Sequence, residues 1–226
     1  PFLYGTVVTS ALALAMAVPL GVGAAIFLAE LAPPRISDGL TFIVELLAAV
    51  PSVIYGLLGI FVLAPLMRRA GAPYGVGIMT AAVVLAIMIL PFIVSISREA
   101  LLSVPREQRE AALALGATRW EATWQVVVPY ARLGIFGSVF LALARALGET
   151  MAVTMVIGNT PQIGASLLEP GYSIAAVIAN EFTEAVEDLH LSALIELGLV
   201  LFGLTLVLNA LARLLIVMTK RKGAEQ

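Results

Sequence analysis

Long apolar runs, rather than alternating apolar and polar positions, dominate this chain. A bilayer core about 30 Å thick is crossed by about 20 apolar residues in an α-helix. Five stretches have that length: about 5–29, 40–66, 76–97, 133–157 and 194–218. Prolines in the second and third stretches are tolerated in bundled membrane helices, because neighbouring groups satisfy the freed carbonyls. The pattern predicts an all-α polytopic membrane helix bundle, a single transmembrane domain over residues 1–226.

Composition supports a membrane protein. Apolar residues make up 61% of the chain and charged residues 12%, with a mean hydropathy of +1.03, whereas soluble domains are about half apolar and a quarter charged. The sequence has no cysteine and a single histidine, His190. A disulfide framework, a thiolate metal site and a multi-histidine metal cage are therefore excluded, and we expect neither a metal nor a cofactor.

The distribution of basic residues predicts the orientation in the membrane. The connection 98–132 carries five arginines and the tail carries Lys220, Arg221 and Lys222, whereas 158–193 has no lysine or arginine. Because lysine and arginine are enriched on the cytoplasmic side, 98–132 is expected inside and 158–193 outside. The connection 30–39, with Arg35, then lies inside, and 67–75, with Arg68 and Arg69, lies outside. The total is nine basic residues inside and two outside. Residue 1 then lies outside, so we expect a sixth span in the complete chain.

Residues 105–129 form what we call the elbow, two short predicted helices between membrane spans. Pro105 suits the first turn of a helix, and Gly116 suits the left-handed position just past its end. Thr118 and Glu121 have the spacing of a capping box, which starts a second helix predicted to stop at Pro129. The small side chains of Ala111 and Ala112 allow another protein to approach the first helix closely.

The elbow also carries a family motif. Glu110-Ala111-Ala112, three residues, Gly116, nine residues, then Val126-x-Val128-Pro129 resembles the EAA loop of ABC-importer permeases, with valine in place of isoleucine and leucine. The resemblance implies that Glu110, Ala111, Ala112, Gly116 and Pro129 belong to a coupling loop that docks on an ATP-binding subunit. From the residues alone, an amphipathic linker built of good helix formers is the alternative.

The chain lacks the G-x-x-x-x-G-K-[ST] phosphate loop. ATP hydrolysis is therefore expected in a separate ATP-binding subunit. We expect this chain to be a transport subunit and not an enzyme.

Two opposite charges fall within the fourth apolar stretch. At 1.5 Å per residue from Leu133, Arg145 is expected about 18 Å deep and Glu149 about 24 Å deep, one turn further on the same helix face. Charges at such depth are costly unless they are paired or face water. The residues allow two interpretations: a structural ion pair between helices, or a site on the substrate pathway where the guanidinium meets an anion.

A second resemblance narrows the family. The run from Arg145 to Asn159 (RALGETMAVTMVIGN), together with 49–56 and 178–182, resembles the phosphate-specific, PstC-like permeases. The resemblance implies a MetI-like permease fold in the bacterial inner membrane and import of inorganic phosphate by alternating access. The implied partners are an ATP-binding subunit dimer, a PstA-like second permease or a second copy of this chain, and a phosphate-binding protein that is periplasmic or lipid-anchored; no nucleic acid is expected. The alternatives are a permease for molybdate, sulfate or phosphonate, and a proton-coupled secondary transporter.

Two local features complete the predictions. Helical spacing of apolar residues from Ser173 to Ala185 predicts a short helix in the connection 158–193. Four glycines are expected to serve close packing between helices: Gly56, Gly59, Gly134 and Gly137.

Overall fold

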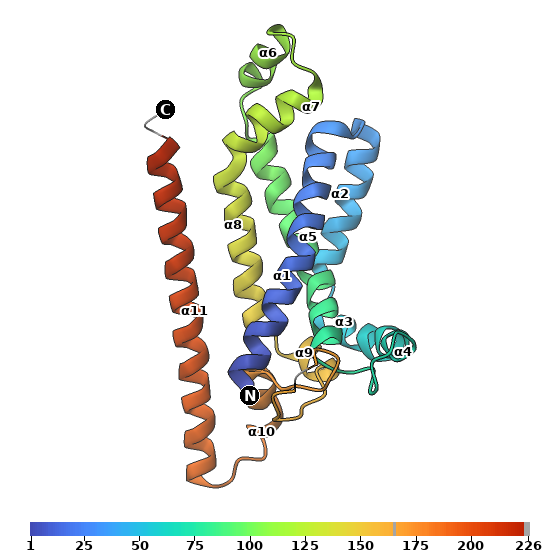
Figure 1. The fold of residues 1–226 in the computed structure, drawn as a ribbon, viewed down its shortest axis with the longest axis vertical. Coiled ribbons are helices and arrows are strands. Elements are labelled where there is room, and N and C mark those ends of the chain that lie inside the picture. Colours follow the sequence, from blue (N-terminus) through green and yellow to red (C-terminus); the bar gives the residue numbers. More distant parts are fainter. Residues whose placement is uncertain (165, 224–226) are drawn as a thin grey trace. The chain divides into compact units, whose positions relative to one another are not determined.

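The computed structural model describes residues 1–164 and 166–223, and it describes side chains up to Leu211 and at Leu214 (Figure 1). All regular structure in these residues is helical, and none of them forms a β-strand. Among the described residues, five helical stretches are long and apolar enough to cross a membrane. They are Phe2–Leu31, Ser52–Arg69, Ile78–Leu102, Arg119–Leu147 and Asp188–Leu211. The predicted all-α class and the predicted number of membrane-crossing helices, five, are confirmed.

The chain divides into two compact units. The first comprises Pro1–Met16, Val50–Met88 and Leu143–Leu211, and the second comprises Ala17–Ala49 and Ile89–Ala142 with the end of the chain. Four of the five boundaries fall inside helices, namely α1 (Phe2–Ile26), α5 (Ile78–Leu102), α8 (Val128–Leu147) and α11 (Asp188–Gly223). Each unit therefore contains segments that are far apart in the sequence.

In the first unit, α3 (Ser52–Leu58) and the π-helical segment η2 (Gly59–Leu63) pack closely on α9 (Met151–Val156). A Cβ atom added to Gly56 would lie 2.6 Å from Met155 Sδ, and one added to Gly59 would lie 2.6 Å from Val156 Cγ1. Such distances leave no room for a side chain. The prediction that these two glycines allow close helix packing is confirmed.

The predicted helix after Ser173 exists but is shorter than expected. α10 spans Ile174–Glu181, and the Ser173 hydroxyl accepts a hydrogen bond from the Ala176 N–H at 3.2 Å. α10 packs on the start of α11 through an apolar cluster. Its buried members are Tyr172, Ala176, Val177 and Leu194.

The second unit contains η1 (Phe27–Leu31), α2 (Pro34–Ala49) and the elbow helices α6 (Arg106–Ala114) and α7 (Arg119–Ala122), followed by η3 (Thr123–Val127). Gly134 of α8 meets the Ala100 side chain of α5, and the Ser97 and Ser138 hydroxyls lie 2.8 Å apart nearby. The packing prediction is confirmed for Gly134. It is wrong for Gly137, which has no atom within 4 Å of an added Cβ, because it lies on an open face of α8.

Two predicted spans are interrupted. The stretch 40–66 breaks at Pro51, whose ψ of 139° is extended, so that α2 ends at Ala49 and α3 begins at Ser52. The stretch 133–157 breaks at residues 148–150, between the end of α8 at Leu147 and the start of α9 at Met151. Glycine is a poor helix former, and Gly148 stands at this second break. Both stretches were predicted as continuous from their apolar character, which does not detect such breaks.

Prolines explain where the helices turn π-helical. Each of the three described π-helical segments ends two residues before a proline: η1 before Pro33, η2 before Pro65 and η3 before Pro129. Proline lacks an N–H, and its ring clashes with the carbonyl four residues earlier, which lies within the π-helical segment in all three cases. A wider turn accommodates that conflict. The predicted stop at Pro129 is therefore wrong: the helix continues through η3 into α8.

Candidate functional site

The elbow begins with an exposed helix. Pro105, with φ −56° and ψ 140°, precedes α6, and Gly116 follows it with a φ of +90°, in the left-handed region that favours glycine. The prediction for Gly116 is confirmed, whereas Pro105 lies one residue before the helix rather than in its first turn. α6 buries none of its residues fully: Glu110 and Ala111 are exposed and Ala112 is half-buried.

The second elbow helix starts with the predicted capping box. The Thr118 hydroxyl accepts a hydrogen bond from the Glu121 N–H at 3.3 Å, and the Glu121 carboxylate accepts one from the Thr118 N–H at 2.8 Å. Two backbone donors at the start of α7 are thereby satisfied. The turn between α6 and α7 is held by its own side chains.

A depression of about 570 Å³ lies between the two elbow helices. Ala111, Ala112 and Gly116 line one part of it. The other lining residues are Gln108, Leu115, Ala117, Glu121, Gln125 and Val126. The structure thus brings together three of the five predicted coupling residues. Glu110 and Pro129 do not line the depression.

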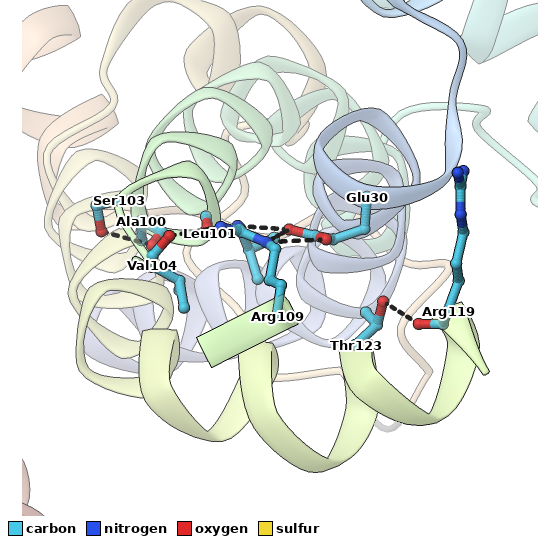
Figure 2. A network of polar contacts seen from close by, with 8 residues as sticks. All are labelled: Glu30, Ala100, Leu101, Ser103, Val104, Arg109, Arg119 and Thr123. Atoms are coloured by element: carbon cyan, nitrogen blue, oxygen red, sulfur yellow. Dashed lines mark hydrogen bonds and ion pairs between the residues drawn. The ribbon is translucent and has the colours of Figure 1, made fainter. Parts of the chain in front are cut away.

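A polar network holds α6 and was not predicted from the sequence (Figure 2). Arg109 of α6 forms an ion pair with Glu30 of η1, in which Nη2 lies 2.8 Å from Oε1 and Nε lies 3.3 Å from Oε2. The same guanidinium donates hydrogen bonds to the carbonyls of Leu101, at 2.7 Å, and Val104. One feature of the sequence could have drawn attention to Glu30: it is the first charged residue of the chain and follows a long apolar run.

Arg145 and Glu149 are not arranged as predicted. Arg145 lies in the last turn of α8 and is exposed on the isolated chain, whereas Glu149 is half-buried in the break between α8 and α9. A Glu149 carboxylate oxygen accepts a hydrogen bond from the Ala152 N–H at 3.3 Å, which caps the start of α9. Because the helix ends at Leu147, Glu149 is not one helical turn above Arg145. This corrects the predicted geometry.

Tyr55 is a third residue of this region, and sequence reasoning missed it. Tyr55 is buried in α3, the helix that packs on α9. Arg145, Glu149 and Tyr55 belong to the same compact unit. A guanidinium and a phenol can both donate hydrogen bonds to an oxyanion.

Acidic and histidine side chains do not gather into a metal site. Among the described residues, no group of three or more histidine, aspartate or glutamate side chains could hold a metal ion.

Comparison with known proteins identifies the class and then the family. The fold resembles the permease fold of solved ABC transporters. One example is a structure of the MetNI methionine ABC transporter in an inward-facing conformation, with a TM-score of 0.76 and 17% sequence identity. The match covers 96% of this chain and 93% of the MetNI chain. Residues 17–218 match the model of the family described as "binding-protein-dependent transport system inner membrane component". The chain belongs to this family.

Curated relatives agree with that assignment. The phosphate transport system permease protein PstC of Mesorhizobium japonicum is 50% identical over 98% of this chain and 74% of its own length. PstC of Haemophilus influenzae is 48% identical over 97% of this chain and 76% of its own length. This chain is thus a multi-pass permease subunit of the bacterial plasma membrane. Its family implies ATP-binding subunits and a substrate-binding protein as partners.

Proposed function

We propose that this chain imports inorganic phosphate. The observation that carries the proposal is the 50% identity, over nearly the whole chain, to a permease named for phosphate transport. The run from Arg145 to Asn159, which is typical of phosphate-specific permeases, supports the same substrate. Membership of a binding-protein-dependent family does not favour the proton-coupled alternative.

Arg145 is the residue that we assign to the anion. Its planar guanidinium can donate two parallel hydrogen bonds to oxyanion oxygens. Glu149 stabilises the break by capping α9, so that Arg145 stays at the very end of α8. Substrate passes by alternating access, in which the bundle opens first to one side of the membrane and then to the other.

The elbow is the proposed coupling site. We assign it to the cytoplasmic side, where an ATP-binding dimer docks on α6 and Ala111, Ala112 and Gly116 leave room for the partner. The other partners are a PstA-like second permease, or a second copy of this chain, and a phosphate-binding protein on the outside. Five acidic residues and no lysine or arginine in 158–193 repel a free anion, so delivery by the binding protein is expected.

Single cysteines test this orientation, because the natural sequence has none. A cysteine at Glu187 should react with a membrane-impermeant maleimide in intact cells, and a cysteine at Glu107 should react only after the cells are opened. The reverse labelling would place the elbow outside and refute the coupling assignment.

Transport by the reconstituted complex tests the substrate. Proteoliposomes with both permeases, the ATP-binding subunits and the binding protein should take up phosphate only with ATP and the binding protein. Excess sulfate, molybdate or a phosphonate should leave uptake unchanged. If one of these anions competes on equal terms with phosphate, or if ATP is not needed, the proposed function is wrong.

A further inference from the structure

The Arg109 side chain links its own helix, α6, to two other segments. It extends from α6 to Glu30 in η1, at the end of the first membrane span, and to the carbonyls of Leu101 and Val104 at the end of α5, the third span (Figure 2). All three kinds of guanidinium nitrogen, Nε, Nη1 and Nη2, donate to these acceptors. The contacts therefore connect α6 to two spans at once.

The ion pair is largely withdrawn from water. The Arg109 side chain is 22% exposed and the Glu30 side chain 11%. A charge pair in such a position is held firmly, because removing one partner leaves the other charged, buried and unsatisfied. A pair fully exposed to water would open at little cost and could not pass a movement from one helix to another.

The spans beneath the pair form a packed block. The end of α1, the end of α5 and the segment from η3 to α8 share an apolar cluster. Its buried members are Ala25, Ile26, Leu101, Val104, Val127 and Ala131. α6 contributes none of these residues and is fully buried at none of its own. The guanidinium thus gives this exposed helix a polar connection to a closely packed group of span ends.

We propose that Arg109 and Glu30 are positioning residues that transmit movement of α6 to the ends of α1 and α5. This inference rests on the proposed function, in which a partner that hydrolyses ATP moves α6. When α6 is displaced, the ion pair pulls on η1, while the two carbonyl contacts pull on the end of α5. Movement of α6 therefore displaces the ends of α1 and α5 together.

The test uses the complete complex in proteoliposomes with Glu30→Gln, which keeps the side-chain size and removes the charge. Retention of the ATP-binding subunits, unstimulated ATP hydrolysis and hydrolysis stimulated by the phosphate-loaded binding protein are measured for each variant. We expect Glu30→Gln to retain the subunits and unstimulated hydrolysis, and to lose about tenfold in the stimulated-to-unstimulated ratio, a size typical of coupling between sites.

Two further variants make the result decisive. Arg119→Gln removes a charge from the same elbow, and no hydrogen bond or ion pair among the described residues joins its side chain to Arg109 or Glu30, so it should behave as wild type (Figure 2). Exchanging the charges with Glu30→Arg and Arg109→Glu restores a pair and should regain part of the stimulation that either single change loses. If Glu30→Gln fails to assemble, the exchanged variant still tests whether the ion pair transmits movement.

The outcomes separate this inference from the proposed function. If the wild-type complex shows no stimulated hydrolysis, the proposed function fails and this inference falls with it. If wild type is stimulated and Glu30→Gln is stimulated equally, only the inference is overturned. It is also overturned if the exchanged variant does not assemble or assembles without any stimulation, because the pair then has a structural role alone.

Discussion

The elbow and the break between α8 and α9 are both short interruptions between helices, but they are stabilised differently. In the elbow, the turn is determined by residues within it: Pro105 before α6, Gly116 at φ +90° and the reciprocal Thr118–Glu121 bonds. The break at 148–150 lies in an apolar run, and the short helix that follows it packs on α3. One interruption is local and polar, whereas the other depends on a neighbouring helix.

This difference shows where local sequence signals are strong. In a segment that water reaches, backbone groups can bond to water, so turn and capping residues decide the conformation. In an apolar span, unsatisfied backbone groups are costly, and an interruption persists only where other segments or side chains satisfy them. Glu149 does so for α9 by accepting the Ala152 N–H.

The largest effect is expected at the break. Arg145→Gln should abolish phosphate uptake into proteoliposomes even when combined with Glu149→Gln, because neutral amides cannot offset the charge of the anion. Assembly should survive, since the amide oxygen of Gln still accepts the Ala152 N–H. Arg145→Lys should fall well below wild type, because an ammonium loses the planar fork. Recovery of uptake in the double variant would show that the charges serve structure alone.

A somewhat smaller effect is expected in the elbow. Ala112→Arg places a long side chain in the depression beside α6 and should lower binding-protein-stimulated ATP hydrolysis about tenfold or more. Gly116→Pro should have a similar effect, because proline cannot adopt a φ of +90°. Ala114→Arg is the matched control, since Ala114 is exposed and does not line the depression. Equal losses in both arginine variants would argue against docking at the depression.

Packing around the break should respond to added volume. Gly59→Ala places a methyl group 2.6 Å from Val156 Cγ1 and 2.9 Å from Val84 Cγ2 and should destabilise the protein by about 1–3 kcal/mol. Gly137→Ala meets open space in α8 and should be neutral or stabilising by up to about 1 kcal/mol. Unfolding in mixed detergent micelles measures both. A Gly59→Ala variant as stable as wild type would mean that η2 and α9 are not in close contact.

The smallest effect concerns the capping box. Thr118→Ala removes the hydroxyl that accepts the Glu121 N–H and should destabilise the start of α7 by about 1 kcal/mol. Amide hydrogen exchange at residues 120–122 should accelerate accordingly, while uptake changes little. Thr118→Ser keeps the hydroxyl and should preserve the slow exchange. Unchanged exchange in Thr118→Ala would indicate that packing alone orders α7.

Much of this protein follows from the sequence because its signals are strong and local. Apolar stretches of about 20 residues predict spans whatever their neighbours are, and Gly116 and the Thr118–Glu121 spacing predict the elbow turn. The RALGET run and the EAA spacing identify the family, which the comparisons confirm. These features depend on residues close together in the chain, so no knowledge of the fold is needed to find them.

Tertiary structure decided the features that depend on distant residues. The helix continues through Pro129 because a π-helical turn precedes it. The span that contains Arg145 ends at Leu147, and the next helix, α9, packs on α3. The Arg109–Glu30 pair joins residues 79 positions apart. No local pattern specifies such a contact, because the free energy that favours it arises only when the ends of α1, α5 and α8 pack together and withdraw both charges from water.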